Sequence, residues 1–140
     1  MISTVAVGTD GSATAAEAVK VATSLARSFD AELVLISAAQ AGKGGPRSGS
    51  SEETQWITNP AARVREILAR AEGEASASGI SCRTLVDEGN PGEVLVRLAN
   101  ECGADVLVIG NKGMQRRMLG SVPNTVAREA PCSVFVVKTT

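Results

Sequence analysis

Short runs of hydrophobic residues alternate with helical patterns along the whole chain. The runs predict five strands, which lie at residues 2–7, 33–36, 80–87, 105–109 and 132–138. Between the runs, hydrophobic residues recur at steps of three and four, a spacing typical of amphipathic helices. This spacing predicts four helices, at residues 16–29, 60–78, 91–102 and 121–130. Strands that alternate with helices pair in parallel through right-handed crossovers, so the pattern predicts an α/β protein with an open five-stranded parallel sheet.

The predicted strands differ in polarity, and this difference predicts their places in the sheet. Residues 33–36 and 106–109 are uninterrupted hydrophobic runs, as expected of strands that helices cover on both faces. Residues 80–87 are more polar, which favours an edge of the sheet. Asn59 and Asn90 each precede a proline and are predicted to cap the helices that follow, because proline fits the first helical position.

One segment, around residues 40–58, has no hydrophobic periodicity. It is rich in glycine and serine, so we expect a flexible loop. The composition is compatible with two interpretations, a disordered surface loop and a mobile flap that covers a nearby ligand. The segment is too short to separate two domains, and residues 1–140 are predicted to form a single domain.

Composition excludes several classes of function. The chain has no histidine, which removes the Ser-His-Asp triad and histidine-ligated zinc. Aromatic residues make up 2% and the net charge is −1, so neither base stacking nor a basic duplex-binding surface is expected. Cys82, Cys102 and Cys132 are widely spaced and are predicted to be buried or half-buried structural thiols. No targeting segment or membrane-spanning run is evident, so we expect a soluble cytoplasmic protein with no membrane partner.

Two glycine-containing segments follow predicted strands, where ligands of open parallel sheets bind. The first is Gly8-Thr9-Asp10-Gly11-Ser12, and the second runs from Gly110-Asn111-Lys112-Gly113 to Gly120-Ser121. Glycine permits a positive φ and lets a ligand approach backbone amides, and a helix that starts near Ser121 favours a phosphate. Lys112, Arg116 and Arg117 either add positive charge to this site or form a solvated face. Neither segment matches a standard phosphate-binding motif. The glycines therefore indicate either tight turns or an anion-binding site.

Asp10 is a candidate for two roles. Its carboxylate can cap the helix that follows, with Ser12 as the alternative cap. It can instead hold a divalent cation such as Mg²⁺ beside phosphates, because hard cations prefer carboxylate oxygen.

Five segments together form a specific signature: residues 5–12, 88–91, 104–113, 119–123 and 130–137. With these segments the chain resembles the universal stress protein family over essentially its whole length. The resemblance implies a flavodoxin-like sheet with the strand order 3-2-1-4-5 and a homodimer formed through the last strand. It also implies that ATP or a related adenine nucleotide is the ligand.

The predicted nucleotide contacts come from the two glycine segments and from the resemblance. Ala38, expected just past the second strand, would offer its backbone to adenine, and Thr9 and Asp10 would lie near ribose and phosphates. The predicted contacts are Gly8, Thr9, Asp10, Ser12, Ala38, Gly110, Asn111, Gly113, Gly120, Ser121, Val122 and Pro123, with Asp10 as the metal ligand.

The spacer 114–119 is shorter than that of the family's ATP-binding motif. Residues 110–111, 120–123 and 137–140 also resemble actinobacterial members that prefer cyclic AMP, whose single phosphate would tolerate a shorter spacer. The leading expectation is a nucleotide-binding stress-response or regulatory module for ATP, with a cyclic AMP sink or sensor as the alternative. A slow ATP hydrolase and a nucleotide-free dimeric scaffold are the competing classes, and no catalytic residue is predicted.

Overall fold

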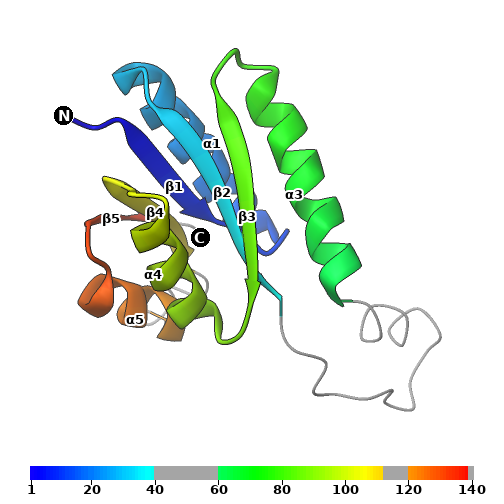
Figure 1. Cartoon of the computed structure of the whole chain (residues 1–140), viewed down its shortest axis with the longest axis vertical. Helices are drawn as coiled ribbons and strands as arrows, with labels where there is room; N and C mark the ends of the chain where they lie inside the picture. Colours follow the sequence, from blue (N-terminus) through cyan, green and yellow to red (C-terminus); the bar gives the residue numbers. More distant parts are fainter. Residues whose placement is uncertain (40–59, 112–119, 139–140) are drawn as a thin grey trace.

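The protein forms one parallel sheet with helices on both faces. The computed structural model describes residues 1–39, 60–111 and 120–138. Within these ranges the elements are β1 (Thr4–Gly8), α1 (Ala13–Phe29), β2 (Glu32–Ala39), α3 (Pro60–Ser76), β3 (Cys82–Glu88), α4 (Pro91–Glu101), β4 (Val106–Asn111), α5 (Ser121–Glu129) and β5 (Ser133–Lys138). The sheet order is β3-β2-β1-β4-β5 (Figure 1), so the predicted class and strand order are confirmed. The predicted loop at 40–58 and Asn59 lie outside the described residues.

Two hydrophobic layers enclose the sheet, because successive side chains of a strand point to opposite faces. Val5 and Val7 of β1 pack with α1 and α3 on one face. Ala6, between them, packs with α4 and α5 on the other face. The sheet is therefore covered on both sides, as its continuous hydrophobic strands predict.

Helix α1 lies close to the sheet because its buried face consists of small residues. These residues are Ala15, Ala18, Val19, Ala22 and Ala26. The helix ends at Asp30, which adopts a left-handed conformation with φ 54° and donates its amide to carbonyls of the last turn. Alanine packing of this kind explains how the chain builds a core with almost no aromatic residues.

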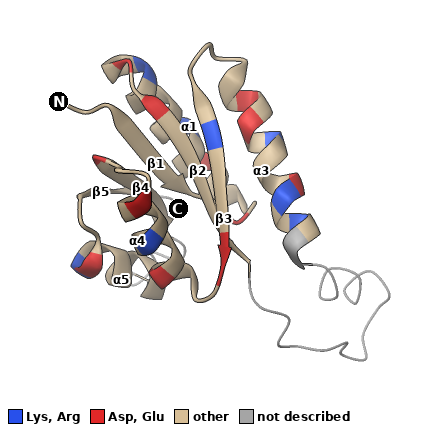
Figure 2. Cartoon of the chain, viewed as in Figure 1, with Lys and Arg blue, Asp and Glu red and all other residues tan. Residues whose placement is uncertain are grey.

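Strand β3 forms a polar edge of the sheet, as predicted. Figure 2 shows charges of both signs along it. Arg83 forms an ion pair with Glu32 of β2 at 3.2 Å, and Asp87 forms one with Arg97 of α4 at 2.8 Å. None of the described helices is long and apolar enough to cross a membrane.

The three cysteines are free and half-buried, which agrees with structural thiols. Burial is the main reason that the pKa of each thiol is raised, and it brings the pKa of Cys82 to about 11. A thiol with a raised pKa forms little of the reactive thiolate near neutral pH.

Asp105 fastens the beginning of β1 to the beginning of β4. Its Oδ2 atom accepts hydrogen bonds from the amides of Ser3 and Thr4, at 2.9 and 3.0 Å, and from the Ser3 hydroxyl at 3.2 Å. The bonds from the Ser3 and Thr4 amides favour the ionised carboxylate, so they lower the pKa of Asp105 from its usual value.

The hydrogen bonds to Asp105 predict that its carboxylate contributes to stability in a pH-dependent way. The pKa of Asp105 is lower in the folded than in the unfolded chain, so the contribution is present above the unfolded pKa and is lost as the pH falls through the folded pKa. Asp105→Asn is therefore expected to lower the urea midpoint at about pH 7 and to have a smaller effect at about pH 3. Glu101→Gln, at an exposed carboxylate, is the control. An equal loss at both pH values would contradict the role of the charge.

Candidate functional site

Strand β1 ends earlier than the strands on either side of it. Its last residue, Gly8, pairs with Ile36, but β2 continues to Ala39. On the other side Val7 pairs with Val108, but β4 continues to Asn111. The carboxyl edge of the sheet therefore has a notch above Gly8. The notch lies where the connections change from one face of the sheet to the other, which is the usual ligand position in such sheets.

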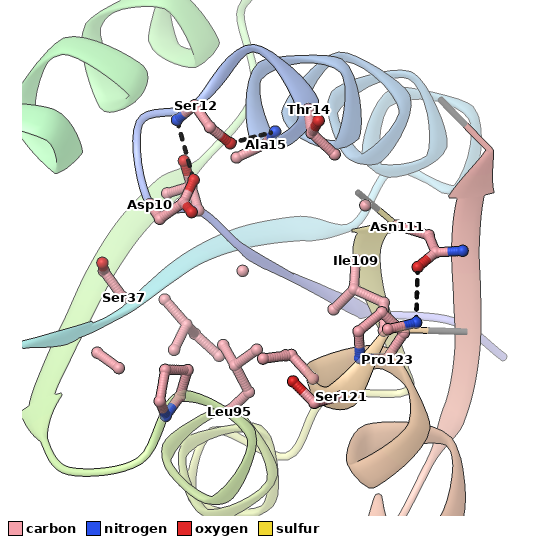
Figure 3. A pocket seen from close by; sticks show the side chains of 18 residues that line it. Asp10, Ser12, Thr14, Ala15, Ser37, Leu95, Ile109, Asn111, Ser121 and Pro123 are labelled. Atoms are coloured by element: carbon pink, nitrogen blue, oxygen red, sulfur yellow. Dashed lines mark hydrogen bonds between the residues drawn. The ribbon is translucent and has the colours of Figure 1, made fainter. Parts of the chain in front are cut away.

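A cavity of about 350 Å³ occupies this notch. That volume is within the range of small-molecule sites. Its walls are the ends of three strands and the first turns of α1, α4 and α5 (Figure 3). The lining residues are Gly8, Thr9, Asp10, Ser12, Thr14, Ala15, Ile36, Ser37, Ala38, Pro91, Leu95, Ile109, Gly110, Asn111, Gly120, Ser121, Val122 and Pro123.

Every predicted contact residue that the structure describes lines this one cavity. Gly113 lies outside the described residues, as do Lys112, Arg116, Arg117 and the spacer 114–119. The sequence analysis missed seven lining residues: Thr14, Ala15, Ile36, Ser37, Pro91, Leu95 and Ile109. The capping pattern at Asn90-Pro91 was the available signal for Pro91. Leu95 reaches the cavity only because α4 packs on the sheet over β2, which brings this side chain against Gly8.

Four predicted positions differ in local structure from the expectation. Gly8, Ala38, Gly110 and Asn111 are residues of strands, not of the loops that follow them. Among the described glycines of the two segments, only Gly11 has a positive φ, at 83°. Close packing is instead the constraint at Gly110, and Gly8 lies against the flexible end of the Leu95 side chain. A Cβ atom at Gly8 would lie 2.9 Å from Leu95, and one at Gly110 would lie 2.7 Å from the Thr14 side chain.

The turn between β1 and α1 is held by its own side chains. Ser12 is the helix cap, and its Oγ atom accepts a hydrogen bond from the Ala15 amide at 3.1 Å. Asp10 does not cap the helix directly; its Oδ1 atom accepts from the Ser12 amide at 2.9 Å (Figure 3). The Thr9 hydroxyl accepts from the Gly11 amide at 3.3 Å. Of the two caps considered above, the structure therefore selects Ser12.

Helix α5 begins differently from α1 and α4. The Asn90 side chain caps α4 by accepting from the Glu93 amide at 3.3 Å. The cap of α5 is Gly120, which has no side chain to accept such a bond. The amides of Ser121 and Val122 begin the helix beside the cavity, and Pro123 has no amide hydrogen. A helix start of this kind attracts an external anion.

The cavity combines an apolar lining with few polar groups. The buried polar residues of the described chain are Thr9, Ser37 and Asn111, and all of them line it. Buried polar residues are costly away from a partner, so their concentration here indicates a binding site. Asp10 is the only charged residue in the described lining. The described residues contain no group of three side chains suited to a metal ion, so a Mg²⁺ ion here would need ligand oxygens in addition to Asp10.

Known proteins similar to this chain share one family description. The model of the universal stress protein family matches residues 1–138. A universal stress protein of Mycobacterium tuberculosis (strain H37Rv) is 39% identical over 145 residues, covering 98% of this chain and 97% of the relative. One from Methanocaldococcus jannaschii is 33% identical over 139 residues, covering 96% and 81%. Among solved structures, a universal stress protein in complex with cAMP is 34% identical, with a TM-score of 0.79 over 99% of each chain.

The two glycines at the ends of the second segment are predicted to respond differently to alanine. A Cβ atom at Gly110 would lie 2.9 Å from the Thr14 carbonyl oxygen, so Gly110→Ala is expected to destabilise the fold by about 1–3 kcal/mol. A Cβ atom at Gly120 would lie 3.5 Å from its nearest neighbour, Asn111 Oδ1, and φ is −66°. Gly120→Ala should therefore cost less than about 1 kcal/mol. Urea unfolding of both variants measures the difference, and equal losses would refute this distinction.

Proposed function

This chain belongs to the universal stress protein family, and we propose that it binds an adenine nucleotide with one phosphate, cyclic AMP first, in the cavity above β1. In this proposal the protein is a regulatory binding module that acts through ligand-dependent shape or choice of partner. The bound nucleotide is the signal and is not a substrate for rapid turnover.

The observation that carries the proposal is the start of α5. Two of the other helix starts at this edge, those of α1 and α4, have a side-chain cap. Helix α5 begins at a glycine and presents the Ser121 and Val122 amides and the Ser121 hydroxyl beside the cavity. These groups donate hydrogen bonds, and the helix dipole adds positive potential, so a single phosphate fits this position.

The rest of the cavity suits a nucleoside. Ile36, Leu95 and Ile109 provide apolar surface for the faces of a purine. Ser37 and Thr9 supply polar groups on the β1–β2 side, where hydrogen bonds to the base edge and ribose are expected. Shape and polarity therefore support a proposed pose with the nucleoside on the β2 and α4 side and the phosphate at α5.

Charge favours one phosphate over three. The only charged side chain in the described lining is the exposed Asp10 carboxylate, which repels additional negative charge. A cyclic monophosphate carries a single negative charge. The structure similar to this chain at 34% identity contains cAMP, which supports the same choice.

ATP with Mg²⁺ is the second candidate, and Asp10 is the observation that favours it. Its carboxylate lines the cavity and would supply one oxygen to the metal, with phosphate oxygens and water completing the shell. Slow hydrolysis of the bound ATP belongs to this candidate. Calorimetric titration with cyclic AMP, AMP and ATP, with and without Mg²⁺, distinguishes the two. ATP binding that is tighter than cyclic AMP binding only in Mg²⁺ would favour the second, and no binding at millimolar ligand would favour a scaffold.

The role of α5 predicts the effect of removing one amide hydrogen. Ser121→Pro should preserve the helix, because proline is favoured at the first helical position and Gly120 already has the extended conformation that precedes proline. Losing a donor to a charged group costs about 1.5–3 kcal/mol, so cyclic AMP affinity should fall about 10- to 150-fold. Ser121→Ala retains the amide and should lose less, and adenosine affinity should change little in both variants. Unchanged cyclic AMP affinity in Ser121→Pro would place the phosphate elsewhere.

The proposal includes a homodimer formed through β5. This strand is at the edge of the sheet beside β4, and a strand edge is a template for pairing with another chain. Phe135 on β5 is 44% exposed, and a second copy paired at this edge would lie beside it.

A charge on this strand is expected to shift the protein toward monomer. Phe135→Lys places a positive charge on the edge, where it disfavours strand pairing. Phe29→Lys is the matched control, because Phe29 is 46% exposed at the end of α1. Sedimentation velocity over a range of concentrations measures the result. A dimer that persists in Phe135→Lys, or dissociates equally in Phe29→Lys, would exclude the β5 interface.

A further inference from the structure

We propose that Asn111 is the positioning residue of this site: its side chain holds the start of α5 in place so that the Ser121 and Val122 amides face the phosphate. The inference rests on the proposed function and assigns Asn111 a specific task within it. The sequence pattern alone places Asn111 among the residues that touch the nucleotide.

The geometry of one hydrogen bond is the first evidence. The Oδ1 atom of Asn111 accepts from the Gly120 amide at 3.0 Å, although the residues are nine positions apart (Figure 3). Asn111 is the last residue of β4, and Gly120 is the cap of α5. The bond therefore joins the end of a central strand directly to the start of the helix.

The burial of Asn111 is the second evidence. The residue is 0% exposed and pairs with Lys138 in the β4–β5 ladder. A buried amide is costly unless it forms hydrogen bonds, and an apolar residue would serve a purely structural position better. The Gly120 bond gives a reason for an amide at this point in the strand.

Helix α5 also needs such a tether. It has nine residues, and only two of them, Pro123 and Val126, are buried. A short helix with few buried contacts is weakly fixed by packing alone. Small displacements of donor groups weaken the recognition of a ligand. A hydrogen bond to a rigid strand keeps the amides of the first turn of α5 in position.

The bond also determines which donors face the ligand. Gly120 would otherwise present its amide along with those of Ser121 and Val122. Because Asn111 accepts from Gly120, the Gly120 amide is engaged within the protein, and the amides of Ser121 and Val122 are the donors that this helix start would offer to a phosphate. The positioning role thus supports selectivity for a monophosphate.

Two variants test the inference, so the test does not depend on the folding of a single substitution. Asn111→Ala removes the acceptor, and Asn111→Leu removes it while conserving approximately the same volume. Asn124→Ala is the matched control, since Asn124 is an exposed asparagine in the first turn of α5. The affinities for cyclic AMP and for adenosine are measured by calorimetry, and the exchange rate of the Gly120 amide hydrogen is measured by NMR without ligand.

Both Asn111 variants should lose about 5- to 100-fold in cyclic AMP affinity, change adenosine affinity by less than about 3-fold, and speed exchange at Gly120. Asn124→Ala should resemble wild type in all three measurements. Equal losses for cyclic AMP and adenosine would overturn the positioning role in favour of a general structural one, and unchanged cyclic AMP affinity would overturn it directly. If the wild-type protein binds neither ligand, the proposed function fails. If the wild-type protein binds and both variants bind equally well, the positioning role of Asn111 fails and the proposed function stands.

Discussion

The early end of β1 is the constraint on which the site depends. Because β2 and β4 continue past Gly8, the sheet edge has a notch at its centre, and the helices that follow these two strands, α3 and α5, pack on opposite faces of the sheet. A parallel sheet closes this edge only with helix starts and turns. Backbone groups from several elements therefore line the notch. Its chemistry depends on which groups accept hydrogen bonds from the first amides of each helix.

The helix starts near the notch satisfy those amides in different ways. Ser12 and Asp10 accept amide hydrogen bonds in the turn before α1, and Asn90 accepts one at the start of α4, so both starts have side-chain acceptors of their own. Helix α5 begins at a glycine and is tied back to β4 through Asn111. The starts of α1 and α4 thus have side-chain caps and the start of α5 has none, which makes the two sides of the cavity different. That asymmetry is the physical basis for placing a phosphate at α5 and a nucleoside against the apolar wall.

Small side chains make this arrangement compact. Gly110 passes within contact distance of Thr14, and Gly8 passes Leu95, so two walls of the cavity approach one another through the absence of a side chain. The alanine face of α1 brings that helix close to the sheet for the same reason. Glycine in the cavity wall thus serves packing at these two positions, and Gly11 is the one described position of the two segments where a positive φ is required.

Hydrophobic period and capping residues are local properties, so the sequence by itself determined the order of elements, the polar edge at β3, the cap at Asn90 and the two glycine segments that line part of the site. Local pattern also explains why the strand ends were misjudged at Gly8, Ala38 and Asn111. Each of these residues belongs to a strand because it pairs with a residue of the neighbouring strand, and that pairing cannot be read from the hydrophobic run. Only the tertiary structure decided that Ser12 caps α1, that Leu95 reaches the cavity, and that Asn111 holds Gly120. Each of these depends on the distance between atoms that the chain brings together only when the sheet and its two helical layers are assembled.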